Sequence, residues 1–187
     1  MKKRLILFGF ILFFCTSIVK YNNSENQEDD KILWSSKRKL IWDDFKGAVP
    51  DTIEPFLAAI TGYTIKLHYE CLDNIVLNYK IENYFIKSKS WTITTDTQTL
   101  AHEQLHFDIA ELYARKIRKS FDSLRLRKNN NVDIYNKIYH SIISKCENYQ
   151  DLYDKKVIGN NKNQQQWIKK IGAELARLKR YEYNPNE

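Results

Sequence analysis

The sequence lacks several features that define large classes of proteins. It has no dense block of lysine and arginine and no nucleic-acid-binding motif, so the formal charge of +7 indicates a mildly basic surface and not a site for nucleic acid. It has no internal repeat. The apolar run Leu5–Phe14 has ten residues, which is short for a membrane-spanning helix. These absences leave a single globular domain with a sizeable core as the simplest interpretation.

Cysteine is also scarce, with three residues in the chain. Removal of Cys15 with a leader peptide would leave Cys71 and Cys146. In an oxidising compartment these two could form a disulfide, and the alternative is a pair of free thiols. Both alternatives stay open because the sequence does not give the distance between them.

The N-terminus is typical of an exported protein. Lys2, Lys3 and Arg4 precede the apolar run, which predicts a signal peptide over residues 1–19 and a secreted or periplasmic location. Without these three cations the formal charge falls from +7 to +4. A lipoprotein attached through Cys15, or an uncleaved anchor, is the alternative. After cleavage we expect no stable membrane span.

Composition divides the rest of the chain into a spacer and a domain. Residues 20–31 are polar and acidic and predict a flexible spacer, and residues 32–183 predict one domain. Strands are expected at Lys39–Trp42, Tyr63–Tyr69, Ile75–Ile81 and Phe85–Thr94, with a hairpin turn at residues 72–74 between the second and third.

Helical periodicity begins after these strands. Asp96 or Thr97 is expected to cap a long helix whose apolar seam comprises Phe107, Ala110, Ala114, Ile117, Phe121 and Leu124. Residues 129–131 break this helix, and a second follows until Gly159. A third helix contains Trp167 and Leu178. Strands first and helices afterwards predict an α+β fold, with an antiparallel sheet followed by a three-helix, zincin-like half.

The most informative motif is His102-Glu103-Gln104-Leu105-His106, an HExxH sequence in the first predicted helix. Histidines four residues apart lie about 40° apart in rotation and about 6 Å apart along a helix axis, so both imidazoles can bind one metal ion. Glu103 lies beside them, where its carboxylate can accept a proton from a metal-bound water. This pattern predicts a zinc hydrolase that cleaves peptide bonds, with Zn²⁺ as cofactor and Glu103 as general base.

Several segments resemble a family of secreted bacterial proteins catalogued mainly as a domain of unknown function and inferred to be zinc-dependent proteases. They are residues 40–47, 58–61, 102–111, 113–115, 153–154 and 166–167, within a span of about 34–178. The resemblance implies a role for Asp154 in the site. The chain departs from the family after Asp154, where the family tends to show threonine and then His-Gly. Here Lys155–Gly159 has no histidine.

A catalytic zinc ion usually has three protein ligands, so one more is expected beside His102 and His106. Glu111 is about 140° around the helix from His106, which makes it a surface or supporting carboxylate instead. The third ligand is expected on the second helix, and the candidates there are Asp154, His140 and Glu147. Asp154 is the first choice because aspartate has a short side chain and a hard oxygen that suit zinc.

The sequence therefore predicts a secreted or periplasmic zinc endopeptidase acting on a peptide or protein substrate. The alternative is a catalytically impaired protein that holds zinc and serves in binding or envelope structure. Glu103 favours the enzyme, and the missing histidine favours the alternative. Tyr153 is a candidate oxyanion donor, although a tyrosine at that helical position is more often part of a core. The oligomeric state stays open.

Export gives a direct prediction. N-terminal sequencing of the exported protein should yield a first residue between Cys15 and Asn26, because cleavage follows the apolar run. A mature protein that still begins at Met1 and stays in the cytosol would refute the signal peptide.

Overall fold

The computed structural model describes residues 29–55 and 57–185. The predicted signal peptide, residues 1–19, lies outside the described residues, as does most of the predicted spacer. The last spacer residue, Lys31, is already part of strand β1 (Lys31–Leu33), where it pairs with Ile86. The folded part thus includes Lys31.

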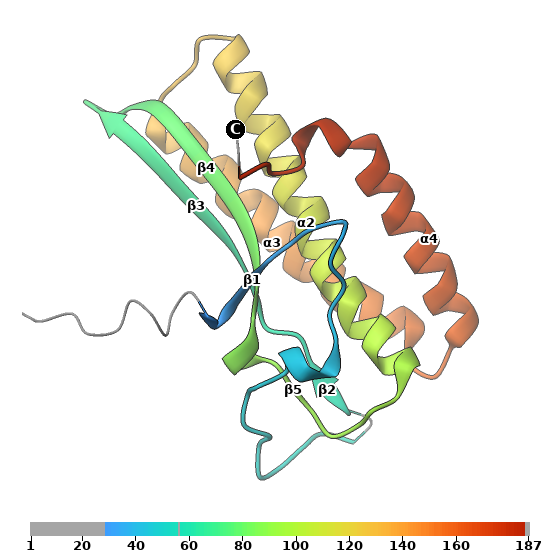
Figure 1. The fold of residues 1–187 in the computed structure, drawn as a ribbon. Helices are drawn as coiled ribbons and strands as arrows, with labels where there is room; N and C mark the ends of the chain where they lie inside the picture. Colours follow the sequence, from blue (N-terminus) through green and yellow to red (C-terminus); the bar gives the residue numbers. More distant parts are fainter. Residues whose placement is uncertain (1–28, 56, 186–187) are drawn as a thin grey trace, which may run out of the picture.

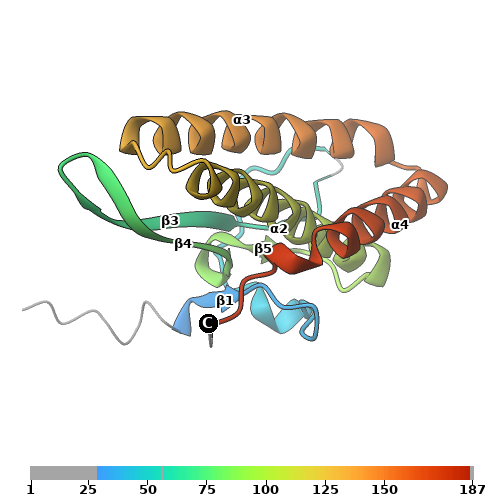
Figure 2. The same ribbon diagram turned by 90° about the horizontal axis from the view of Figure 1, so that it is seen from above.

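The N-terminal half contains two antiparallel sheets. The larger has the order β1-β4-β3 and combines β1 with β3 (Tyr63–Leu72) and β4 (Ile75–Ile86). The smaller pairs β2 (Ala59–Ile60) with β5 (Trp91–Thr92). Figure 2 shows the β3–β4 hairpin extending beyond the helices. Its turn is the predicted one, with Asp73 and Asn74 at φ values of 49° and 64°.

The predicted strand at Lys39–Trp42 is wrong. Its last residue instead begins a 3₁₀ turn, Trp42–Asp44. The Asp44 carboxylate accepts hydrogen bonds from the Ile41 main-chain N–H at 2.9 Å and from the Arg38 guanidinium at 2.6 and 3.1 Å. Such side-chain bonds to nearby groups compete with strand pairing and bend the chain into a turn.

The predicted strand at Phe85–Thr94 is interrupted. Its first two residues end β4, a 3₁₀ turn covers Lys87–Lys89, and β5 follows. The Ser90 hydroxyl donates to the Ile86 carbonyl at 2.7 Å, which closes this turn. Gly62 allows the close approach, because a Cβ there would lie 2.6 Å from the Lys89 Cβ.

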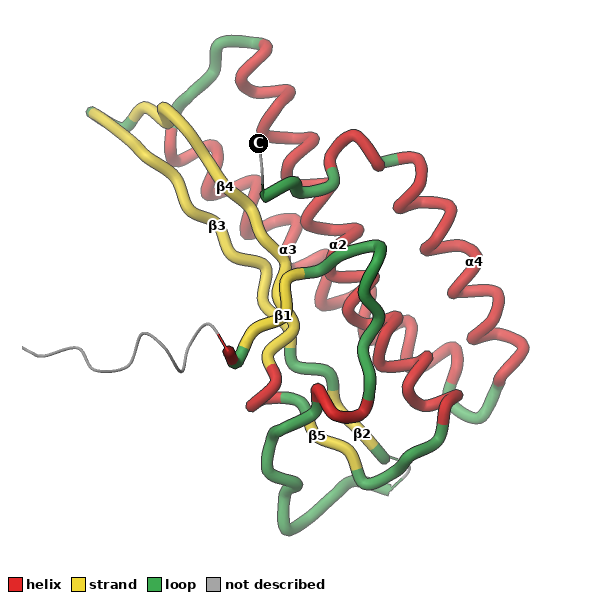
Figure 3. The backbone as a smooth tube through the Cα atoms, in the orientation of Figure 1, coloured by secondary structure: helices red, strands yellow, loops and turns green. Residues whose placement is uncertain are grey.

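Three helices follow the strands, so the α+β prediction is confirmed. Helix α2 (Thr97–Leu126) begins at the predicted cap, Asp96, whose carboxylate accepts from Thr99 N–H at 2.7 Å. Helices α3 (Val132–Val157) and α4 (Asn161–Arg177) complete the fold. Figures 1 and 3 show α2 crossing the middle of the molecule, and it contacts the sheets, α3 and α4. Within the described residues, no helix is both long and apolar enough to cross a membrane.

The core lies along α2. All six residues of the predicted seam are at most 3% exposed, which confirms that interpretation. Phe121 is typical, with ring centroids 5.1 Å from Tyr79 and 4.5 Å from Tyr135. These contacts join α2 to β4 and to the start of α3. The burial of such large apolar side chains is the main favourable contribution to folding.

Charged residues are also buried on α2, on the face next to the apolar seam. Glu111 is 1% exposed, so the surface position, one of the two alternatives expected for it, is wrong. Its Oε1 accepts from Arg115 Nε at 3.0 Å and from Arg118 Nη1 at 2.9 Å. Arg118 also donates to the Ile81 carbonyl of β4, and Arg115 donates to the Leu175 carbonyl of α4. The carboxylate is stable there because two guanidinium groups compensate its charge.

The two described cysteines are free. Cys71 is exposed near the hairpin turn, whereas Cys146 is buried on α3, 3.8 Å from the Tyr63 hydroxyl. The structure therefore contains the free thiols and not the disulfide.

Replacement of Phe121 by alanine should lower the free energy of unfolding by about 3–5 kcal/mol, because it leaves a cavity among well-packed rings. Leu126→Ala is the control on the same helix, since Leu126 is 81% exposed and should change stability by less than about 0.5 kcal/mol. Urea unfolding of the two variants measures both values. Equal effects would contradict the placement of the core.

Candidate metal centre

The candidate site lies where the beginning of α2 meets the end of α3. Helix α2 carries His102, Glu103 and His106 within its first three turns, and α3 contributes Asp154 from its last turn. In Figure 1 these two helix ends lie at the same end of the molecule, beside β2 and β5. The i, i+4 spacing of the histidines places both on the α2 face that points to α3.

Three potential ligand atoms converge on one point. His102 Nε2 and His106 Nε2 are 3.0 Å apart, and Asp154 Oδ1 lies 3.1 and 3.0 Å from them. Atoms bound about 2.0–2.1 Å from a tetrahedral zinc ion are about 3.3 Å apart, so the spacing fits a metal ligand set. His102, His106 and Asp154 therefore form a group that could hold a metal ion.

Aromatic packing holds the two imidazoles in place. The Tyr153 ring is stacked on His102, with centroids 4.7 Å apart and planes at 23°, and it meets His106 edge-on at 5.0 Å. Trp167 of α4 packs behind it, with centroids 5.4 Å apart. Tyr153 is fully buried and lines neither cavity described below. Its ring is therefore part of the core, and its buried hydroxyl has no hydrogen-bond partner among the described residues.

The charges of the group influence each other. Burial by itself raises the pKa of the Asp154 carboxyl, but the adjacent His102 and His106 outweigh it and hold the pKa well below its usual value. Burial lowers the pKa of His106, but the Asp154 carboxylate outweighs this effect and the net pKa is raised. Without a metal, the site thus favours a carboxylate beside an imidazolium. Metal binding requires neutral imidazoles and would release protons.

Glu103 is buried beside the histidines without a partner for one oxygen. The residue is 4% exposed, and no described group forms a hydrogen bond with its Oε2. The Thr61 hydroxyl donates to the Glu103 carbonyl at 3.1 Å, which attaches this turn of α2 to the end of β2. Since a buried polar atom without a partner is costly, Oε2 is in the state expected of a group that acts on a ligand.

Two cavities adjoin the site, with volumes of about 480 and 500 Å³. His102 and Glu103 line both, and His106 and Asp154 line the second. Other residues common to both are apolar: Leu57, Ala59 and Ile158. The first cavity is also lined by polar residues from the first turns of α2 and α4. The second is also lined by residues of the loop before β2. Together they form an open cleft beside the candidate metal centre.

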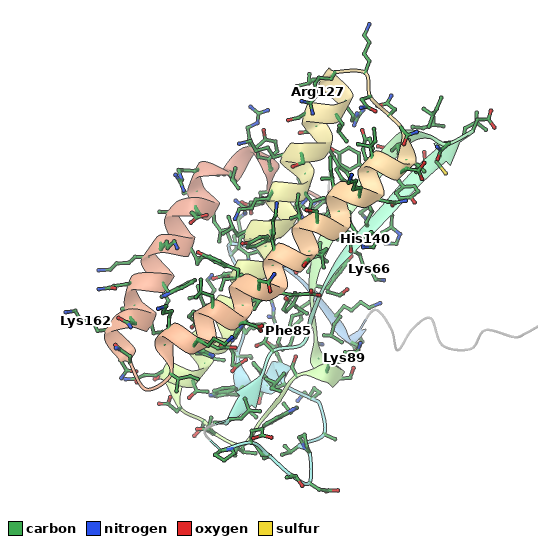
Figure 4. All side chains as sticks on the ribbon, turned by 180° about the vertical axis from the view of Figure 1, so that it is seen from behind. Lys66, Phe85, Lys89, Arg127, His140 and Lys162 are labelled. Carbon is green, nitrogen blue, oxygen red and sulfur yellow. The ribbon has the colours of Figure 1, made fainter. Side chains whose placement is uncertain are left out.

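The two alternative third ligands lie elsewhere on α3. His140 is 14 residues before Asp154, or about 21 Å along the helix axis. It shares a groove with Leu67 and Tyr69 of β3. Figure 4 labels His140 on α3. Glu147 is two turns before Asp154 and lies in a different groove, beside Cys146. Asp154 is thus the candidate that the structure brings to the histidines.

One residue of the site was not predicted from the sequence. Gln150, one turn before Asp154 on α3, forms hydrogen bonds with the His106 ring and with its main chain. A glutamine on a mostly polar helix has no distinctive pattern. Its i, i+4 spacing from Asp154 is the signal that could have indicated it.

Comparison with known protein families gave one match. Residues 87–160 match a family described as a bacterial protein of unknown function, DUF922. The match confirms the resemblance to a family catalogued in that way, and it names no activity. It is narrower than the span of 34–178, but it contains all of His102, Glu103, His106, Gln150 and Asp154. Comparisons with curated proteins and with solved structures gave no significant match.

The site predicts the metal content of variants. The wild-type protein should bind about one metal ion per chain, and His102→Ala, His106→Ala and Asp154→Ala should each lose it, because each removes one of three ligands. His140→Ala is the control, since its imidazole lies in a separate groove. Elemental analysis after loading and desalting measures the stoichiometry. Equal metal content in all five proteins would refute the site.

Proposed function

We propose that this protein is a secreted or periplasmic zinc-dependent endopeptidase. The observation that carries the proposal is the buried Glu103 carboxylate with its unpaired Oε2, beside three converging ligand atoms and open to a cleft. A carboxylate in this position can act as a general base or acid on a molecule in the cleft. The predicted signal peptide supports the location.

Zinc is favoured among the metals that these donors suit. Two imidazoles and one carboxylate match both zinc and non-haem iron(II). The HExxH arrangement adds a carboxylate that does not bind the metal and lies next to it, which hydrolysis through a metal-bound water requires. Oxygen chemistry on iron has no need of such a base.

In the proposed reaction, His102, His106 and Asp154 would hold zinc, and the Tyr153 ring keeps the two imidazoles oriented. Zinc bound there would lower the pKa of a water molecule and polarise the scissile carbonyl. The Glu103 carboxylate would accept a proton from the attacking water and later deliver it to the leaving amine. Helix α2 is rigid in the core, so the distance from Glu103 to the ligands is maintained during the reaction.

The strand beside the cleft favours an extended peptide as substrate. Ile93 N–H donates to the Ala58 carbonyl, so residues 58 and 93 form a hydrogen-bonded pair of the β2–β5 ladder. In an antiparallel ladder the next residue, Ala59, then directs its N–H and C=O away from β5. Ala59 lines both cavities, and β2 has only β5 as neighbour within the described residues. A peptide could pair with this edge across the site.

One observation favours the alternative, a catalytically impaired protein that holds zinc. Ile158, directly before Gly159, is 68% exposed and lines both cavities. In the resembling family a His-Gly pair tends to follow the Tyr-Asp pair, and the shorter stretch here has no histidine. An alkyl side chain at this position can neither donate a hydrogen bond to an oxyanion nor transfer a proton. A protein that binds zinc but hydrolyses no peptide in a broad library would support this alternative.

Glu103→Gln tests the mechanism. The amide keeps the size of the side chain but cannot accept the proton, so peptide hydrolysis should fall by about 10²–10⁴-fold while zinc content and folding stay unchanged. Glu147→Gln is the matched control, because it removes a carboxylate from α3 outside the cleft. Hydrolysis of a peptide library and zinc content should be measured in parallel. A wild-type rate retained in Glu103→Gln would refute the mechanism.

A further inference from the structure

Gln150 contacts His106 through both ends of its amide group. Its Oε1 lies 2.8 Å from His106 Nδ1, and its Nε2 donates to the His106 main-chain carbonyl at 2.9 Å. The side chain is well buried, with 7% of the residue exposed. A main-chain carbonyl only accepts hydrogen bonds, so the amide nitrogen must face it and the amide oxygen must face the ring.

This orientation determines which ring nitrogen carries the proton. Because Oε1 only accepts, Nδ1 must donate, and a neutral imidazole has a single N–H. Nε2 then has its lone pair free, and that atom is the one 3.0 Å from His102 Nε2 and from Asp154 Oδ1. Neutral histidine side chains in water favour the opposite tautomer, with the proton on Nε2. Gln150 therefore offsets this preference.

We propose that Gln150 is a positioning residue that holds His106 in the tautomer able to bind metal and thereby raises the metal affinity of the site. The inference rests on the metal centre of the proposed function. Partners of this kind typically change metal affinity by about 10–100-fold. Gln150 and Asp154 are one turn apart on α3, so the same face of one helix supplies a ligand and the residue that orients a second ligand.

The neutrality of Gln150 suits the charge of the site. Asp154 already contributes one negative charge to the ligand set, and the Glu103 carboxylate lies beside it. A carboxylate at position 150 would make His106 a more negative ligand and weaken the positive field of the metal, which polarises the substrate. An amide orients the ring without this effect.

Gln150→Met tests the proposal, because methionine has a similar length but cannot accept the Nδ1–H bond. Zinc affinity, measured by competition with a chelator, should fall by about 10–100-fold. In NMR spectra of the zinc-loaded, ¹⁵N-labelled protein, the His106 Nδ1–H signal should be protected from exchange with water in the wild type and lost in this variant. Gln150→Glu keeps the acceptor for Nδ1–H but loses the bond to the His106 carbonyl, so it should retain the signal and bind zinc more tightly than Gln150→Met.

Gln164→Met is the matched control. Gln164 is equally buried, and its Nε2 donates to the Gln98 carbonyl at 2.9 Å, joining α4 to α2, and within the described residues its side chain forms no hydrogen bond with a metal-ligand candidate. Its zinc affinity should equal that of the wild type. A folded Gln150→Met variant with wild-type affinity, or an equal loss in Gln164→Met, would overturn the role of Gln150.

These outcomes are separate from those that test the proposed function. Weaker zinc binding in Gln150→Met, combined with no hydrolysis by the wild type, would support the positioning role and refute the peptidase. Absence of zinc binding in the wild type would overturn both. Hydrolysis by the wild type with unchanged affinity in Gln150→Met would refute only the positioning role.

Discussion

The burial of α2 through the middle of the molecule is the constraint on which the rest of the structure depends. Its apolar face forms the core with the sheets and with α3, and its buried arginines attach it to β4 and α4. The helix therefore cannot shift without loss of both the core and a compensated set of buried charges. Its first turns project from this rigid part toward the cleft, and they carry His102, Glu103 and His106. A site on such a helix is held more precisely than one on loops.

The candidate metal centre requires a second helix as well. Each helix contributes residues one turn apart: two imidazoles from α2, and Gln150 with Asp154 from α3. Tyr153 fills the space between them and contacts both imidazoles. The packing of α3 against α2 thus serves stability and site geometry together. Within five consecutive residues, α3 places an amide, an aromatic ring and a carboxylate around the two imidazoles.

Local patterns predicted much of the fold. The β3–β4 hairpin follows from alternation and from a turn of residues that tolerate positive φ, and the three helices follow from apolar periodicity and capping residues. The failures at Lys39–Trp42 and Phe85–Thr94 have a common cause. In both segments a strand-like pattern was overridden by side-chain hydrogen bonds, from Asp44 in one and Ser90 in the other. The surface position expected for Glu111 was wrong because its two arginine partners, one and two turns further along α2, are also buried. A charged residue in a sequence gives no sign that it is buried.

The sequence alone determined that the two histidines lie on one helix face with the glutamate beside them. The helical repeat places residues four apart on one face whatever surrounds the helix. For the third ligand, the sequence left three candidates on α3 and no means to choose between them by distance. The tertiary structure decided which of them lies near the histidines, since only the docking of α3 on α2 brings Asp154 to 3.0–3.1 Å from both imidazoles and places His140 and Glu147 in other grooves. It also brings Gln150 to His106 and forms the partly apolar cleft that Glu103 lines. Distances between residues some 50 positions apart depend on how helices pack, and no local period encodes them.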